Sequence, residues 1–175
     1  MESHDYGTQA RFEETMAFAR NCACQRLGIA FCIGLRREAA ILCKILAANG
    51  FEVESAVCKN GAYPNGLLGI DDDKVTLGSF EPTCNPIGQA CCLEEAGTQL
   101  AIVLGLCVGD DSLFLAYSRA PVAVPAAKDR VLGHNAPAAL YSTNVYYRGK
   151  LSASEASPAG QACAAAAADE VANSG

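Results

Sequence analysis

Short, mainly apolar runs alternate along the chain with segments of helical period. Three of these runs, at residues 26–32, 51–58 and 99–107, end in a cysteine, and a fourth run covers residues 122–127. Apolar runs of this length are typical of strands that are buried on both faces of a parallel sheet. We therefore expect four such strands.

The segments between the runs carry apolar residues at helical spacing. Over residues 35–49, the positions Ala39, Leu42 and Leu46 recur at helical intervals, and an Asn-Gly pair closes the segment. Such a pair is a typical end of a helix, because the glycine readily takes the left-handed conformation there. Further helices are expected over residues 8–19, 86–96, 113–117 and 137–141.

Strands that alternate with helices predict an α/β fold. Strands buried on both faces need a helical layer on each side, which gives a three-layer αβα architecture with a Rossmann-like or flavodoxin-like parallel sheet. Right-handed crossovers leave few topologies for four strands, and we favour the order 2-1-3-4. In such sheets ligands bind at the carboxyl ends of the strands, beside the point where the strand order reverses. We expect the functional site there.

A single α/β domain is expected over residues 1–151. Within it, residues 59–83 are rich in glycine and show no sustained period, and a loop this long is usually functional, so we expect it to form a lid. Residues 152–175 change in composition to alanine, serine and glycine and are expected to be a disordered tail.

Composition and charge exclude two classes of partner. The net charge of −6 argues against binding along a phosphate backbone, so no nucleic-acid partner is expected. The longest apolar stretch, residues 100–108, is too short to span a bilayer, and residues 1–20 have no secretory apolar segment. A cytoplasmic protein without a membrane partner is expected.

Cysteine is the residue type with the strongest link to chemistry here. The chain has 10 cysteines, and in a reducing compartment such a content indicates metal binding or catalysis more than disulfides. Cys32, Cys58 and Cys107 end apolar runs, and Cys84 lies in the loop before a predicted helix. Since strands lie about 4.8 Å apart, we expect these four to meet at one sheet edge, with Cys32 and Cys107 side by side. They are named the four-cysteine set below.

Three interpretations of the four-cysteine set remain open. First, four thiolates suit a zinc ion or an iron–sulfur cluster, which implies a redox or metal-handling role. Second, Cys107 or Cys84 is the nucleophile of an enzyme, with Lys128 or His134 as its acid–base partner. Third, the cysteines are buried packing residues of a non-catalytic module that binds a small ligand. We favour the first, with a small molecule or a redox protein as the partner.

A second group of candidate residues follows the fourth predicted strand. Lys128, Asp129, His134 and Asn135 are expected to face the same sheet edge. A lysine there lowers the pKa of a thiol or binds an anion, and His134 is either a further ligand or a general acid or base. The alternative is an exposed Lys-Asp pair with a histidine that caps a helix. Asp111 is expected to cap the helix at 113–117, with ligand binding as its alternative.

The chain contains four distinctive motifs, which are GIAFCIGL at 28–35, FEPTCNPIGQ at 80–89, LGLCVGDDSLF at 104–114 and KDRVLGHN at 128–135. In this order they resemble the DUF1847 family of uncharacterised, cysteine-rich bacterial and archaeal proteins, whose members are described as predicted metal-binding proteins. The resemblance covers residues 5–148 and implies that the four-cysteine set and the segment after the fourth strand are the family's motif positions. Members of the family are expected to begin with an additional segment of closely spaced cysteine pairs, which this chain lacks.

Overall fold

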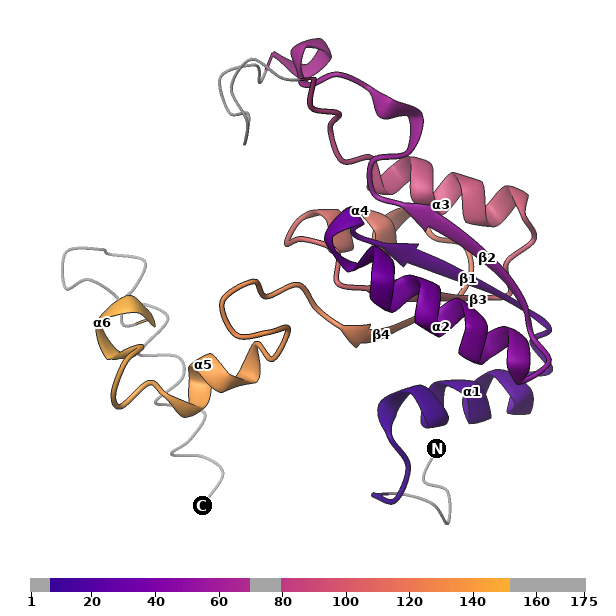
Figure 1. Cartoon of the computed structure of the whole chain (residues 1–175), viewed down its shortest axis with the longest axis horizontal. Coiled ribbons are helices and arrows are strands. Elements are labelled where there is room, and N and C mark those ends of the chain that lie inside the picture. Colours follow the sequence, from indigo (N-terminus) through magenta and orange to yellow (C-terminus); the bar gives the residue numbers. More distant parts are fainter. Residues whose placement is uncertain (1–6, 70–79, 152–175) are drawn as a thin grey trace, which may run out of the picture. The chain divides into compact units, whose positions relative to one another are not determined.

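The computed structural model describes residues 7–69 and 80–151, and its contacts divide the chain after Asn135. The two parts are therefore treated separately (Figure 1). Much of the expected lid, at 70–79, and the whole expected tail, at 152–175, lie outside the described residues. The domain boundary after residue 151 stays a prediction.

Four parallel strands form one sheet in the first part. They are β1 (Arg26–Phe31), β2 (Glu52–Val57), β3 (Leu100–Leu104) and β4 (Val122–Ala126), and their order across the sheet is β2-β1-β3-β4. This confirms the predicted α/β class and strand order. The order reverses between β1 and β3, which is where such folds place ligands.

Helices form where the apolar spacing predicts them. The first part contains α1 (Arg11–Asn21), α2 (Arg36–Ala48), α3 (Pro86–Glu95) and α4 (Asp110–Tyr117). The start of α3 is well defined, because the Asn85 side chain caps the helix by accepting from the Gly88 N–H at 2.8 Å. Short 3-10 turns, which the sequence pattern does not predict, are η1 (Ile33–Leu35), η2 (Asn60–Ala62) and η3 (Asn65–Leu68).

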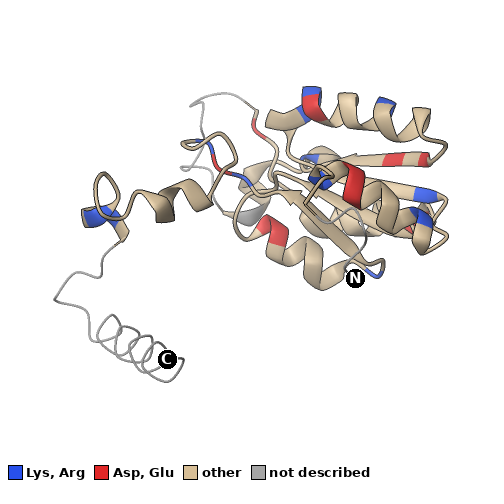
Figure 2. Ribbon diagram, turned by 90° about the horizontal axis from the view of Figure 1, so that it is seen from below, with Lys and Arg blue, Asp and Glu red and all other residues tan. Residues whose placement is uncertain are grey.

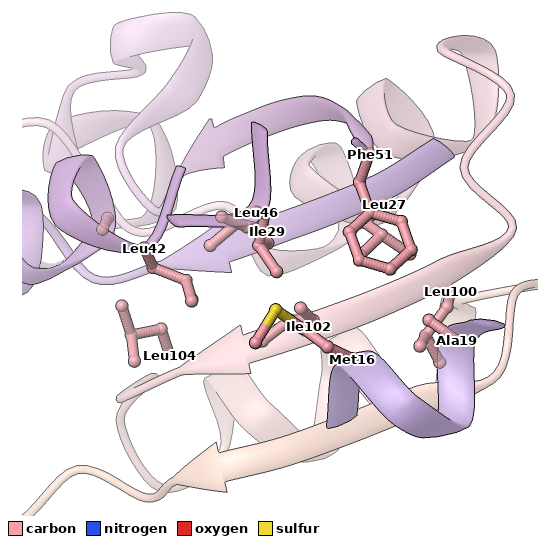
Figure 3. Packing of buried hydrophobic residues seen from close by; sticks show 11 residues of the cluster. Met16, Ala19, Leu27, Ile29, Leu42, Leu46, Phe51, Leu100, Ile102 and Leu104 are labelled. Carbon is pink, nitrogen blue, oxygen red and sulfur yellow. The ribbon is translucent and has the colours of Figure 1, made fainter. Parts of the chain in front are cut away.

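Helices cover both faces of the sheet. On one face, Met16 of α1 and Leu46 of α2 converge on side chains of β1 and β3 such as Leu27 and Ile102 (Figure 3). On the other face, α3 and α4 pack on the sheet, and the fully buried Phe114 of α4 belongs to that cluster. The layers are thus helix, sheet and helix, as predicted.

Strand β3 is shorter than the predicted strand at 99–107. Gly105 follows β3 with φ +61°, a conformation that ends extended structure and favours glycine. Its N–H still donates to the Ala126 carbonyl at 2.8 Å, and a β-carbon at this position would clash with the Leu35 side chain. The chain therefore leaves the sheet before it reaches Cys107.

Alanine at position 105 is expected to lower the free energy of unfolding by at least about 2 kcal/mol, because left-handed strain adds to overpacking against Leu35. Gly133→Ala is a matched control, since Gly133 has φ +59° and open space around it. It should cost only the strain, about 1 kcal/mol. Denaturant unfolding of both variants measures the difference, and equal losses would show that the contact with Leu35 is unimportant.

The second part contains α5 (Pro137–Tyr141), which the sequence predicts, and α6 (Arg148–Leu151), which it does not. Lys150 Nζ donates to the Tyr146 hydroxyl at 2.8 Å and lies 4.1 Å from the ring centroid. This hydrogen bond to Lys150 lowers the pKa of Tyr146.

Charges of both signs are spread over the ribbon, on helices and at strand ends (Figure 2). The expectation that no nucleic acid binds stays a prediction. Within the described ranges, none of the helices has both the length and the apolar character that crossing a membrane requires.

Candidate functional site

Strands β1 and β2 end at the same level and bring two thiols together. Phe31 pairs with Val57, so the next residues, Cys32 and Cys58, are neighbours at the sheet edge. The Cys58 N–H donates to the Phe31 carbonyl at 2.9 Å, and the Ile33 N–H donates to Cys58 Sγ at 3.4 Å. Cys32 is 5% exposed and Cys58 only 1%.

Hydrogen bonds attach the loop that carries Cys84 to the end of β2. The Asn85 N–H donates to the Cys58 carbonyl at 2.6 Å. The Asn60 side-chain amide donates to the carbonyls of Asn85 at 2.9 Å and Val57 at 3.0 Å. Half-buried Cys84 therefore lies beside buried Cys58.

Three sulfur atoms are joined by hydrogen bonds, from Cys32 to Cys58 and from Cys58 to Cys84. We call Cys32, Cys58 and Cys84 the thiol chain. The bond to Cys58, with burial, raises the pKa of Cys32 to about 12. The bond from Cys32 lowers the pKa of Cys58, but its own bond to Cys84 and burial raise it more. Cys84 accepts from Cys58, and this hydrogen bond contributes most to its lowered pKa.

Charged side chains also act on Cys84. Lys59, which donates to the Pro82 carbonyl at 2.6 Å, lowers the pKa of Cys84, and the negative charge of Asp110 raises it. Burial raises the pKa of Asp110 itself, and the hydrogen bond with Cys84 lowers it in part. Cys84 thus lies between a cation and a carboxyl group with increased affinity for a proton.

Asp110→Asn is expected to make Cys84 more acidic, because it removes a negative charge that opposes the thiolate. Labelling of Cys84 by iodoacetamide at mildly acidic pH should become about two- to tenfold faster, since one unit of pKa corresponds to a factor of ten. Asp111→Asn is the matched control, because Asp111 does not act on Cys84 directly and accepts from the Ser112 N–H at 2.8 Å. Slower labelling of the Asp110 variant would contradict this assignment.

Cys107 lies at the margin of the site. Arg130 Nη2 donates to Cys107 Sγ at 3.4 Å, and the Arg130 charge also interacts with Cys32 and Cys84. The sequence predicts Cys32 and Cys107 as neighbours, whereas the structure pairs Cys32 with Cys58. The difference arises because the chain turns at Gly105, before it reaches Cys107.

Of the residues predicted after β4, Lys128 reaches the thiols. Its ammonium group hydrogen-bonds to Cys32, and it lies so close to Gly34 that a β-carbon there would be 3.1 Å from Nζ. The Asp129 carboxylate instead accepts from the Leu132 N–H at 2.8 Å. His134 Nδ1 accepts from the Asp129 N–H at 3.1 Å.

Asn135 and Asp111 take part in local turns. The Asn135 N–H donates to the Leu132 carbonyl at 3.1 Å, which closes the turn that also contains His134. Helix α4 begins at Asp110, earlier than predicted, with Gly109 as its N-cap, so Asp111 lies inside the first turn and is not the capping residue. Its carboxylate accepts from the Gly109 N–H at 3.1 Å. Their ligand-binding roles stay predictions.

The sequence predictions omit four residues of the site. Lys59 directly follows Cys58, and Asp110 begins the helix after Cys107. Their closeness in sequence to these cysteines could have identified them as site residues. Arg130 belongs to the motif after β4. Gln89 is fully buried and donates through Nε2 to the carbonyls of Phe31 at 3.2 Å and Ala56 at 2.6 Å, which attaches α3 to the sheet edge. Only its position in the FEPTCNPIGQ motif marks it.

The arrangement of the donors bears on the predicted metal. Within residues 7–69 and 80–151, no group of three or more His, Cys, Asp or Glu side chains is positioned to hold a metal ion. All nine cysteines in these ranges are free thiols. A bound metal would require the sulfurs to converge further.

A surface hollow of about 380 Å³ lies away from the cysteines. It is lined by Thr98 and Pro121, which precede β3 and β4, so it is at the amino ends of the strands. Another hollow, of about 300 Å³, lies at the residues that follow Cys32 and is lined by Ile33, Gly34 and Arg37 among others. Its lining residues do not include the members of the thiol chain.

Fold and site together define a doubly wound parallel α/β protein with a cluster of free thiols at the carboxyl ends of β1 and β2. The chain belongs to the family described as "Protein of unknown function (DUF1847)", which matches residues 1–124. It is 46% identical over 156 residues to "Uncharacterized protein MJ0455" of Methanocaldococcus jannaschii, a match that covers 86% of this chain and 76% of the relative.

The family match confirms the predicted membership. It ends before the KDRVLGHN motif at 128–135, which the resemblance includes. The expected additional cysteine-rich segment of other members stays a prediction.

Proposed function

We propose that the protein performs thiol chemistry, with Cys84 as its nucleophile. The observation that carries this proposal is the polarity of the thiol chain: Cys84 is its half-buried end and accepts hydrogen bonding from Cys58. A thiolate is the reactive form of cysteine, and donors and cations around it increase its population. Cys84 therefore has the features of an activated nucleophile.

Neighbouring groups control the ionisation of Cys84. When Cys84 is protonated, its thiol hydrogen-bonds to Asp110, whose negative charge opposes ionisation of Cys84. Lys59 stabilises the thiolate. The sequence favours Lys128 or His134 for acid–base catalysis. Lys128 hydrogen-bonds to Cys32, and Nδ1 of His134 accepts from the Asp129 N–H, so we propose neither of them as the partner of Cys84.

Site-resolved alkylation tests the proposal. Cys84 is expected to react with iodoacetamide at mildly acidic pH at least about tenfold faster than Cys91, an exposed cysteine of the same segment. Cys84→Ser should remove this fast reaction, and Cys91→Ser should leave it unchanged. Peptide mass spectrometry over a pH series measures both rates. If Cys84 reacts no faster than Cys91, the proposal is wrong.

Binding of a soft metal ion is the second candidate function, and the hydrogen bonds that join the sulfurs of the thiol chain favour it. Cys32, Cys58 and Cys84 would be the donors, with Cys107 as the predicted fourth. Thiolates hold zinc at about 2.3 Å and are the usual ligands of iron–sulfur clusters. Binding would displace the protons that now join the sulfurs, so the pH dependence of affinity would be steep.

Metal analysis of anaerobically purified protein separates the two candidates. A metal role predicts zinc or iron in stoichiometric amount, with visible absorption for a cluster, and its loss in Cys58→Ala. Freely titrating thiols at all four members of the four-cysteine set, together with less than stoichiometric metal, would contradict it. The outcome does not depend on any assay of turnover.

A further inference from the structure

We propose that Cys58 is the resolving thiol of Cys84 and that the site exchanges thiols with low-molecular-weight disulfides. This inference rests on the proposed role of Cys84 as the nucleophile and names the class of its substrate. It concerns the pair Cys58 and Cys84, which we call the dithiol pair. In the reducing compartment that the sequence predicts, both are free thiols.

The backbone brings the dithiol pair into register. The residue after Cys84, Asn85, donates its N–H to the Cys58 carbonyl at 2.6 Å. The Asn60 side chain bridges the carbonyls of Val57 and Asn85, the residues directly before Cys58 and after Cys84. Because the two side chains also pack in one buried cluster, a disulfide between them requires little movement of either segment.

Burial sets the order in which the two thiols react. Cys58 is 1% exposed, so an external disulfide cannot reach it. Cys84 is half-buried and open to a substrate. Cys58 therefore reacts only with an electrophilic sulfur that has already formed on Cys84, which is the task of a resolving cysteine.

The exchange balances in two steps. The Cys84 thiolate attacks one sulfur of the substrate disulfide, so the substrate S–S bond breaks, a mixed disulfide forms and one thiolate leaves. Cys58 then transfers its proton to the departing group and attacks the Cys84 sulfur. The Cys58–Cys84 disulfide forms as the second substrate thiol leaves. The protein loses two electrons, and the substrate disulfide gains them.

Two donors assist the second step. The Ile33 N–H lies 3.4 Å from Cys58 Sγ, and the Cys32 thiol donates to the same sulfur. Both stabilise the negative charge that develops on Cys58 when it attacks. A buried thiol beside the nucleophile can release an adduct that is held on Cys84 by a disulfide bond, whereas it cannot cleave a thioether. This favours a disulfide substrate.

The test treats the reduced full-length chain with 2-hydroxyethyl disulfide, a neutral probe, and maps cysteine linkages by mass spectrometry. The wild type should show a Cys58–Cys84 link and little adduct. Cys58→Ser should accumulate the mixed disulfide on Cys84, at least about tenfold above the wild type. Cys91→Ser is the matched control and should behave as the wild type.

The outcomes distinguish this inference from the proposal on which it rests. If the wild type retains the adduct on Cys84, or links Cys84 to Cys32 or Cys107, the resolving role of Cys58 is wrong and the nucleophile stands. If Cys84 acquires no adduct in any variant, both proposals fail. The wild-type linkage map decides the point even if the Cys58 variant folds poorly.

Discussion

Replacing Phe114 by alanine is expected to lower the free energy of unfolding by about 3–5 kcal/mol. Phe114 is 0% exposed and is the largest fully buried side chain in the described residues. It packs against the face of the sheet that also carries Cys58, so truncation leaves a cavity beneath the site. Denaturant unfolding followed by circular dichroism measures the loss.

Phe80→Ala is the matched control for this substitution, because the Phe80 side chain is 68% exposed. We expect a change within about 0.5 kcal/mol, which is usual for surface positions. The cavity variant should also label at Cys58, which is protected in the wild type. If the free energy of unfolding falls equally in both phenylalanine variants, the buried cluster that contains Phe114 does not contribute to stability as described.

The second large effect is expected on reactivity. Cys58→Ala removes the hydrogen-bond donor that contributes most to the lowered pKa of Cys84. The pKa of Cys84 should rise, and because the thiolate fraction falls with it, labelling at mildly acidic pH should slow about tenfold for each unit. The rate at high pH, where Cys84 is ionised in either protein, should change little. A full pH profile measures both limits.

Cys58→Ser provides the control, since a hydroxyl group keeps a donor at the same place. It should restore most of the labelling rate at mildly acidic pH, whereas the alanine variant does not. Equal pH profiles for the alanine variant and the wild type would mean that Cys58 does not stabilise the Cys84 thiolate. A lower rate at high pH as well would indicate a structural effect.

The sheet was predictable because its signals are local and repeated. Apolar runs that end at Cys32 and Cys58, separated by a helix of regular period, define a crossover whose strands must be neighbours. The register of Phe31 with Val57 then places these two cysteines together. The strand order alone therefore predicts that Cys32 and Cys58 are neighbours in the candidate site.

The remainder of the site depends on conformations that no period encodes. The left-handed turn at Gly105 directs Cys107 away from the sheet, and the capping role of Asn85 fixes where Cys84 stands. The partners Lys59 and Asp110 are each close to a predicted cysteine in sequence, but their contact with Cys84 is tertiary. Sequence patterns therefore predicted which edge of the sheet carries the site, but not which side chains contact one another there.

Single methyl groups line much of the surface between α3 and the sheet. Ala30, Ala56 and Ala101 on the strands meet Ala90 on the helix in one buried cluster. Small side chains let α3 approach closely, so their volume sets how far the helix, and the loop before it, stands from the strand ends. A larger residue at Ala90 would therefore separate Cys84 from Cys58 without altering either thiol. The reactivity of Cys84 thus depends on how closely α3 packs against the sheet, several residues away from the thiols.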